Sequence, residues 1–228
     1  MKLVDPHITI VDDFKPDEIM KKLEKAARTC YQSNDDKKIT DPAKLLSNII
    51  KRGHTSVIEH AIISFRIITD RGVTHELVRH RIGCSYSQES TRYCKYDGDV
   101  QFIKHVNDPC QAYLCEMNKQ CEKEYDILRD VGGATPQIAR QALNNNVKTE
   151  IYVTMNMRAL RNFFTLRCAK GAHPYMKEIA IPFLLYMKEK LPVLFNDISY
   201  DEEFYNTRLK GFTENMVTCK CEYKEDVE

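Results

Sequence analysis

Two runs of β-branched and aromatic residues, each followed by a helical pattern, set the strongest limit on the fold of this chain. Residues 61–69 read Ala-Ile-Ile-Ser-Phe-Arg-Ile-Ile-Thr without glycine or proline, and residues 149–155 alternate in the same manner. Both patterns are typical of β-strands. Apolar side chains at helical spacing then predict helices over 73–81 and 158–169. We therefore expect strands with helices packed against them.

Further helices are predicted on both sides of these two units. Apolar residues at helical spacing indicate a helix over 16–32. Asp41-Pro42, a capping residue followed by a first-turn proline, predicts a second helix through Ile50, so the N-terminal third is expected to be largely helical. Long helices are also predicted over 108–129, 136–143 and 174–190, and a further strand over 100–106.

The chain has 228 residues, with no internal repeat and no glycine- or proline-rich linker. This length and organisation favour a single domain over residues 1–228. The order of elements predicts an α+β fold with a central, mostly antiparallel sheet packed by long helices. Residues from about 200 to 228 show little apolar periodicity, so we expect a peripheral tail there.

Composition excludes several classes of protein. Lysine and arginine number 34 and aspartate and glutamate 33, a net charge of +1 that gives no global field for binding nucleic acid. No run approaches the ~18 apolar residues of a membrane span, and the N-terminus lacks the features of a signal peptide. We therefore expect a cytoplasmic protein that binds neither membrane nor nucleic acid. The nine cysteines are odd in number and irregularly spaced, which favours free thiols over a disulfide framework.

Arginine is distributed unevenly along the chain. Nine of the thirteen arginines lie in two windows without lysine, 52–94 and 149–169. Arginine binds phosphate and carboxylate in bidentate geometry and keeps its charge when buried, whereas lysine is a mobile point charge. The clustering indicates a polyanionic ligand. The alternative is a set of structural ion pairs with Asp70, Glu59 and Glu76.

The densest cationic segment is residues 79–93, Arg-His-Arg-Ile-Gly-Cys-Ser-Tyr-Ser-Gln-Glu-Ser-Thr-Arg-Tyr. It reads as a helix end that continues into a polar loop with arginines at both ends. Backbone N–H groups, hydroxyls and guanidinium groups together are what a nucleotide phosphate requires. We therefore expect a phosphate-binding loop.

Several common catalytic motifs are excluded. His75 and His80 are five residues apart, whereas two zinc ligands on one helical face need a spacing of four, so no metal site is predicted. The glycine signatures of dinucleotide-binding, P-loop and α/β-hydrolase proteins are absent from the sequence. Cys84 near His80 leaves a minor alternative of a cysteine nucleophile with its base.

Four blocks of sequence, spread over residues 50–180 in order, resemble the flavin-dependent thymidylate synthase family. Arg79-His80-Arg81 followed by Ser90-Thr91-Arg92 resembles its R-H-R…S-x-R signature. Residues 53–60, Gly-His-Thr-Ser-Val-Ile-Glu-His, are similar to its G-H-x-[ST]-x-x-E-H block. Asn156-Met157-Arg158, Asn162 and Leu166-Arg167 are similar to its N-x-R…N…L-R block, and Arg140 occupies the place of another family arginine.

This resemblance implies a homotetramer of α/β subunits with active sites shared between chains. It also implies conversion of dUMP to dTMP with FAD, with methylenetetrahydrofolate as carbon donor and NADPH as reductant. Arg167 would lie at the pyrimidine ring, where its charge stabilises negative charge and activates the ring as the catalytic residue. The residues implied to bind FAD are Ser56, Glu59, Arg79, His80, Arg81, Gln88, Asn156, Arg158 and Asn162. Those implied to bind dUMP are Glu76, Arg79, Gln88, Glu89, Ser90, Thr91, Arg92, Arg140 and Arg167.

The sequence departs from the family pattern at three places. Eight residues separate Arg81 from Ser90 where the family usually has seven, Glu76 stands where a glutamine is usual, and the segment 171–178 is longer than usual. A carboxylate beside phosphate is repulsive unless it pairs with His75 or an arginine, so Glu76 either turns outward or alters ligand preference. Three alternatives stay open: a related flavoenzyme that hydroxymethylates the pyrimidine, a flavin-binding protein without activity, and a nucleic-acid-binding helix with Tyr86 and Tyr93 stacking on bases.

Overall fold

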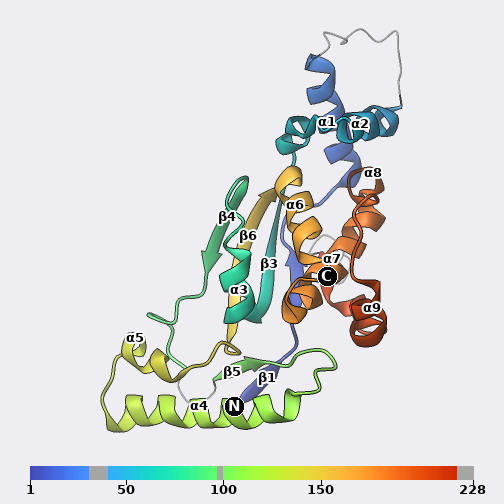
Figure 1. The fold of residues 1–228 in the computed structure, drawn as a ribbon. Helices are drawn as coiled ribbons and strands as arrows, with labels where there is room; N and C mark the ends of the chain where they lie inside the picture. Colours follow the sequence, from blue (N-terminus) through green and yellow to red (C-terminus); the bar gives the residue numbers. More distant parts are fainter. Residues whose placement is uncertain (31–40, 97–99, 220–228) are drawn as a thin grey trace, which may run out of the picture.

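The computed structural model describes residues 1–30, 41–96 and 100–219. Its centre is an open five-stranded sheet in the order β4-β6-β3-β2-β7, in which the first three pairings are antiparallel and β2–β7 is parallel (Figure 1). A parallel pair, β1 with β5, forms a separate two-stranded sheet. The strands are β1 (Lys2–Val4), β2 (His7–Ile10), β3 (Ile62–Asp70), β4 (Cys84–Gln88), β5 (Gln101–Ile103), β6 (Lys148–Asn156) and β7 (Val217–Cys219).

The pair β3–β6 has the longest pairing in the sheet and confirms both strands predicted from sequence. The two strands are in register over nine residues, from Ile62 opposite Asn156 to Asp70 opposite Lys148. In β6, Ile151, Val153 and Met155 are buried while the residues between them are not. Each strand runs directly into a helix at its end, α3 (Arg71–Leu77) after β3 and α6 (Met157–Arg167) after β6.

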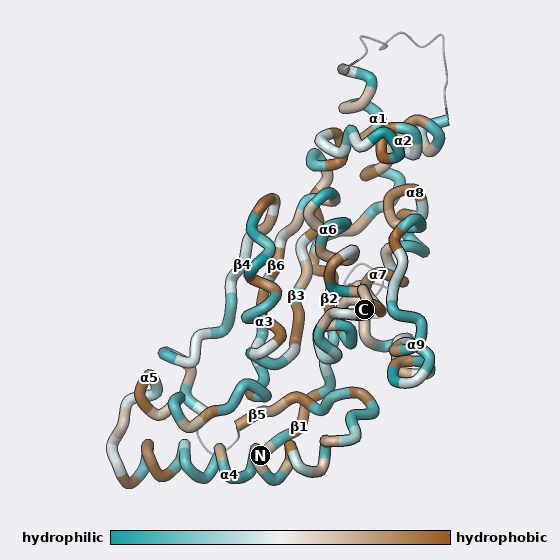
Figure 2. Tube along the Cα trace, viewed as in Figure 1, coloured by the Kyte–Doolittle hydropathy of each residue, from teal (hydrophilic) through white to brown (hydrophobic). Residues whose placement is uncertain are grey.

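The main hydrophobic core lies where α6 and α7 (Pro174–Lys190) pack against the sheet. Phe183 of α7 links both layers, because its ring contacts Phe65 of β3 at 4.8 Å and Phe164 of α6 at 5.3 Å between centroids. Figure 2 shows hydrophobic colouring along β3 and in α7. Helices α1 (Pro16–Cys30), α2 (Pro42–Lys51) and α8 (Pro192–Phe195) extend this core, and confirm the predicted helices near residues 16–32 and 41–50, although residues 31 and 32 lie outside the described part.

A second, smaller core lies under α4 (Gln111–Asp126), the long helix at the bottom of Figure 1. Its buried members are Val100, Phe102, Tyr125, Ala139 and Val147. The helix continues into a π-helical turn, η2 (Ile127–Val131), which together with α4 matches the predicted helix over 108–129. Among the described residues, no helix combines the length and apolar character that crossing a membrane requires.

Several predicted elements differ from the structure. The helix expected over 73–81 begins earlier and ends at Leu77, and single turns follow in which the N–H groups of Arg79 and His80 donate to the carbonyls of Glu76 and Leu77. The Tyr86 hydroxyl also contacts the carbonyls of Leu77 and His80. The segment expected as a loop after it contains strand β4, which pairs with β6. The helix expected over 136–143 consists of two short turns, α5 (Pro136–Ala139) and η3 (Arg140–Ala142). The strand expected over 100–106 covers only β5.

Both ends of the chain contribute more to the fold than the sequence suggested. The N-terminal third contains strands β1 and β2 as well as helices. The expectation of a peripheral tail is wrong for the described residues 201–219, which form α9 (Glu202–Phe204), the turns η4 (Tyr205–Leu209) and η5 (Thr213–Asn215), and β7. Lys177 of α7 and Asp201 make a buried ion pair of 2.9 Å that anchors this segment. Cys219 is disulfide-bonded, which corrects the expectation of free thiols at that position.

Candidate functional site

Arg167, the last residue of α6, has its guanidinium group held by two residues from around the end of α3. Its Nε–H donates to Nε2 of His80 at 3.0 Å, Nη1 donates to the Glu76 carboxylate at 2.7 Å, and Nη2 donates to the Glu76 carbonyl at 3.1 Å. The Glu76 carboxylate therefore turns toward an arginine, one of the two partners considered from sequence. Since a guanidinium group has five N–H groups, two remain for a ligand.

The turn Arg79-His80-Arg81 directs its side chains in opposite directions. Arg79 and Arg81 are exposed, whereas His80 is buried, with 8% of its surface accessible. The His80 ring packs edge-on against Phe163, with 5.4 Å between ring centroids. Burial and the neighbouring Arg167 charge both lower the pKa of His80, so the ring is neutral at neutral pH. The two arginines are thus available to an anion, while the histidine belongs to the interior.

Gly83 and Asn156 join the turn after α3 to the start of α6. Gly83 adopts a φ of +73°, which favours glycine, and its carbonyl accepts the N–H of Asn156 at 2.9 Å. The Asn156 side chain accepts the N–H of Ala159 at 2.8 Å and so caps α6. Asn156, predicted to bind FAD, therefore has a structural role in this protomer.

The expected phosphate loop is divided between interior and surface. Gln88 of β4 donates to the hydroxyl of Thr74 at 2.8 Å, and so points under α3. Glu89 accepts from the Tyr96 hydroxyl at 2.8 Å and from Lys148 at 2.9 Å, which leaves its carboxylate within a structural network. These contacts occupy two residues that the resemblance places at FAD or dUMP.

The following three residues and Arg140 form a more open group. Thr91 is buried, and the Nη1 of Arg140 from η3 donates to its hydroxyl at 3.5 Å. The Ser90 hydroxyl accepts the N–H of Arg92 at 3.3 Å. Arg92 is exposed and lies over the ring of Tyr93, 5.3 Å from its centroid. Two guanidinium groups and two hydroxyls thus flank one turn, as a phosphate-binding site requires.

A third group of predicted residues lies where the 3₁₀ helix η1 (Thr55–His60) packs on α6. Arg158 donates to Glu59 at 2.6 Å, and both side chains are substantially exposed. Ser56 and Asn162 are exposed and offer a hydroxyl and an amide. The structural-ion-pair explanation of the arginine windows therefore holds in part, for Arg158 with Glu59 and for Arg167 with Glu76.

A cavity of about 590 Å³ adjoins Glu76. Its polar wall includes His75, His173, Tyr175 and Asp70, and Leu114 and Met117 of α4 form an apolar side. His105, not considered from sequence, lies buried behind this wall, where its ring stacks on Tyr175 at 3.4 Å and contacts Glu178 and Asn146 at 3.0 and 2.8 Å. Burial raises the pKa of Asp70 and of Glu178.

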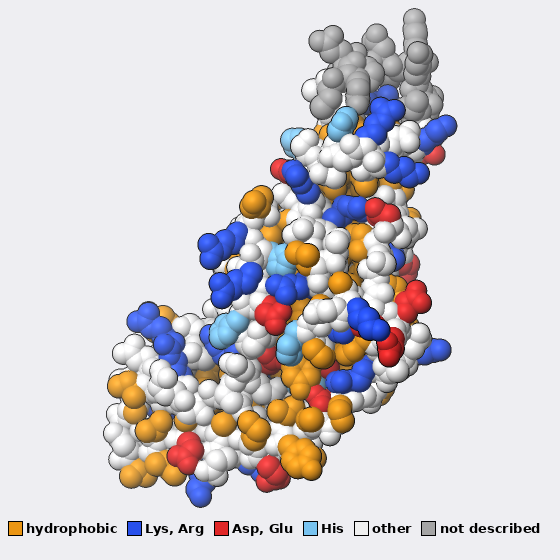
Figure 3. All heavy atoms as spheres, viewed as in Figure 1, with side chains coloured by type: hydrophobic (Ala, Val, Ile, Leu, Met, Phe, Trp, Pro, Cys, Tyr) orange, Lys and Arg blue, Asp and Glu red, His pale blue; other side chains and the backbone are white. Residues whose placement is uncertain are grey.

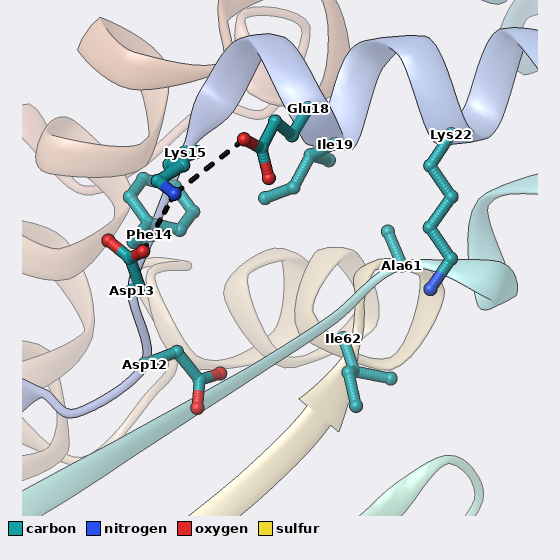
Figure 4. Close-up of a pocket in the computed structure, with 9 residues that line it drawn as sticks. All are labelled: Asp12, Asp13, Phe14, Lys15, Glu18, Ile19, Lys22, Ala61 and Ile62. Carbon is teal, nitrogen blue, oxygen red and sulfur yellow. Dashed lines mark ion pairs between the residues drawn. The ribbon is translucent and has the colours of Figure 1, made fainter.

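A smaller pocket of about 280 Å³ lies between the start of α1 and the start of β3 (Figure 4). Of its two lysines, Lys15 and Lys22, Lys15 is paired with Asp13 at 2.8 Å and with Glu18 at 3.6 Å, as the dashed lines show. None of the site residues predicted from sequence lines this pocket. The cavity beside Glu76 is therefore the better candidate for a site.

Comparison with known proteins identifies the family. The family model Thy1, described as thymidylate synthase complementing protein, matches residues 10–193. The chain belongs to the Thy1 family. It is 37% identical to a flavin-dependent thymidylate synthase of Geobacter sulfurreducens over 187 residues, 75% of this chain and 78% of that protein. It is 35% identical to the enzyme of the same name from Mycobacterium tuberculosis, over 77% of this chain and 78% of that protein.

The Thy1 fold is also seen in a solved structure. A UMP/dUMP methylase, PolB from Streptomyces cacaoi, bound with 5-Br dUMP, superposes with a TM-score of 0.71 at 20% identity, over 90% of this chain and 97% of that chain. This likeness establishes the fold. Every site residue predicted from sequence lies within the stretch that the Thy1 model matches.

Proposed function

We propose that this Thy1 chain is a flavin-dependent thymidylate synthase that converts dUMP to dTMP. FAD, methylenetetrahydrofolate as carbon donor and NADPH as reductant are parts of the proposal, as is a cytoplasmic location. Family membership and the relatives of that name support it. The observation that carries it is Arg167, a partly exposed residue whose guanidinium group keeps two N–H groups for a ligand and is bonded to Glu76, which lines the cavity.

Two groups of residues, at the turn after α3 and where η1 packs on α6, fit a flavin dinucleotide. Arg79 and Arg81 are exposed guanidinium groups suited to a pyrophosphate, and Asn162 and Ser56 are exposed hydrogen-bonding groups suited to ribityl or ring atoms. When bound, the flavin supplies the hydride chemistry. The protein would hold and orient the ligands.

The turn containing Ser90, Thr91 and Arg92, with Arg140, is the proposed site of the dUMP phosphate. Arg167 would lie at the pyrimidine, where its N–H groups stabilise negative charge that develops on the ring and so promote electrophilic attack at C5. No cysteine or serine nucleophile is required. Cys84 in fact has a raised pKa because of burial, which disfavours the thiolate that a nucleophile needs.

The proposal includes a homotetramer with shared active sites. In support, α4 and the turn after it expose large apolar side chains: Tyr113 is 76% exposed, Met117 54% and Val131 83%. Figure 3 shows hydrophobic side chains gathered on the surface formed by α4. A second copy of the chain is the proposed partner for this surface, because apolar patches of this kind mark protein interfaces.

The test is the near-ultraviolet and visible absorbance of the purified protein during titration with dUMP. A flavin band that shifts with dUMP is expected, because both ligands would share one site. A colourless protein that FAD does not reconstitute would overturn the proposal. Mass analysis of the nucleotide formed with all substrates then separates the methyl product from the hydroxymethyl alternative.

A further inference from the structure

The environment of Arg167 differs from that of an ordinary surface ion pair. Its guanidinium group makes three hydrogen bonds to two residues that precede it by 87 and 91 positions in the sequence. The side chains of Arg167 and Glu76 keep 20% and 35% of their surface exposed. The guanidinium group is thus held by three hydrogen bonds while part of the Arg167 side chain stays exposed.

The hydrogen bond from Arg167 fixes the protonation of His80. Nε2 of His80 receives the Nε–H of Arg167, and an atom that accepts a hydrogen bond carries no proton. The ring must therefore be neutral with its proton on Nδ1. Protonation of Nε2 would remove the acceptor and place a second cation beside the guanidinium group.

His80 is itself held by every element around it. Phe163 of α6 packs on the ring, and the Tyr86 hydroxyl of β4 donates to the His80 carbonyl at 2.6 Å. The charged and titratable groups that face it are Arg167 from α6, Tyr86 from β4 and, through Arg167, Glu76 from α3. A histidine so enclosed has little surface left for a cofactor.

We propose that His80 and Glu76 are positioning residues for Arg167: the neutral His80 ring and the Glu76 carboxylate, as hydrogen-bond acceptors, orient the guanidinium group toward the substrate nucleotide. The inference rests on the proposed function and changes two of its assignments, because the resemblance places His80 at FAD and Glu76 at dUMP. Each terminal nitrogen of Arg167 keeps one N–H for a carbonyl or phosphate oxygen.

Two substitutions of His80 separate positioning from cofactor binding. His80→Gln retains an oxygen acceptor for Arg167, whereas His80→Leu removes it. We expect His80→Leu to lower kcat about tenfold or more, as for loss of a hydrogen bond to a charged group, with FAD affinity retained. The wild-type kcat should fall at low pH, because protonation of Nε2 removes the acceptor for Arg167. His80→Gln should restore most of the kcat and remove this fall from the pH profile of kcat. The control His7→Gln, a histidine of β2 outside the site, should leave the profile unchanged.

Glu76 is tested in the same way. Glu76→Gln keeps an oxygen for Nη1 but removes the negative charge, so dUMP should bind more tightly while kcat changes by less than about threefold. Glu76→Leu should lower kcat as His80→Leu does. Equal kcat values for the Gln and Leu variants at either position would overturn the inference, as would loss of FAD affinity in His80→Leu comparable to that in Arg79→Ala.

A measurement independent of turnover keeps the inference distinct from the proposed function. Nitrogen-15 NMR of the histidine rings at neutral pH, with His80 assigned from His80→Gln, should show Nδ1 protonated and Nε2 unprotonated. If Nε2 is protonated, the inference fails even in an active enzyme. If the tautomer is as expected but the protein binds neither flavin nor dUMP, the arrangement around Arg167 stands and the proposed function fails.

Discussion

Gly83 lies so close to Asn156 that a Cβ at position 83 would be 2.4 Å from Nδ2 of Asn156. This contact joins the turn that carries Arg79 and Arg81 to Asn156, the last residue of β6 and the N-cap of α6. Arg167 lies at the other end of α6. The short distance explains why a glycine occurs in this turn. It also sets the position of α6 relative to β4.

Gly83→Ala should lower the free energy of unfolding by about 1–3 kcal/mol, because a φ of +73° is strained for alanine and the new Cβ displaces the helix cap. Urea denaturation provides the measurement. Gly171→Ala is the matched control, since its added Cβ would meet nothing within 4 Å. Equal effects of the two substitutions would contradict the close contact at Gly83.

Asp201→Asn should lower the free energy of unfolding by about 3 kcal/mol at neutral pH, as expected for breaking a buried ion pair. Burial alone would raise the pKa of Asp201, but hydrogen bonds from Lys177 and the Phe204 N–H lower it overall. The stabilising contribution of a carboxylate with a lowered pKa is present above its unfolded value of about 3.9 and is lost as pH falls through the folded value. The difference in free energy of unfolding between wild type and variant, measured by urea denaturation at a series of pH values, should therefore narrow below about pH 4.

The control for Asp201 lies two residues along the chain. Glu203 pairs with Lys170 at 2.9 Å, but both side chains are largely exposed. Glu203→Gln should change stability by less than about 1 kcal/mol at any pH. A loss as large as that of Asp201→Asn would mean that the last segment is not anchored through the buried pair.

Arg92→Ala should weaken dUMP binding far more than FAD binding, because Arg92 belongs to the turn proposed for the nucleotide phosphate. Titration of each ligand, followed by flavin absorbance and fluorescence, measures both affinities. Comparable losses of the two ligands would show that the turn contacts both, and that the longer interval between Arg81 and Ser90 shifts the contacts.

Arg167→Ala should abolish turnover while leaving flavin bound, since the proposed role of Arg167 is to stabilise charge on the pyrimidine. Arg167→Lys keeps the charge but cannot bond to His80 and both Glu76 oxygens in one plane, so it should stay well below wild-type kcat. Single-turnover assays with reduced flavin measure the chemical step. An active Arg167→Ala enzyme would rule out the ring-activating role.

Sequence patterns predicted the elements that are rich in buried apolar residues. Strands β3 and β6 and helices α2 and α7 were found where expected, because their apolar residues pack in the core. Strand β4 was missed because Cys84-Ser-Tyr-Ser-Gln88 is polar and forms the edge of the sheet, where pairing with β6 decides the conformation. Strands β2 and β7 are only four and three residues long, too short for a periodic signal.

The sequence predicted which residue types occur at the candidate site but not how their side chains are arranged. The arginines, hydroxyls and amides were identified from sequence, and the structure adds which of them face inward. Gln88, Glu89 and His80 are engaged in the protomer by Thr74, Lys148 and Arg167, contacts over 14 to 87 positions that no local pattern reveals. Tyr86, expected to stack on bases only under the nucleic-acid alternative, instead donates to the carbonyls of Leu77 and His80.

The parallel pairing of β2 with β7 brings Ile8 opposite Val217. A ribosome must therefore add more than 200 residues after β2, through β7, before the second hydrogen-bonding edge of β2 is covered. Until then the nascent protein presents an open strand edge to neighbouring nascent chains, a known route to misassembly. Synthesis that stops before residue 217 would leave this edge permanently exposed, so truncated products should be removed by proteolysis or aggregate rather than accumulate.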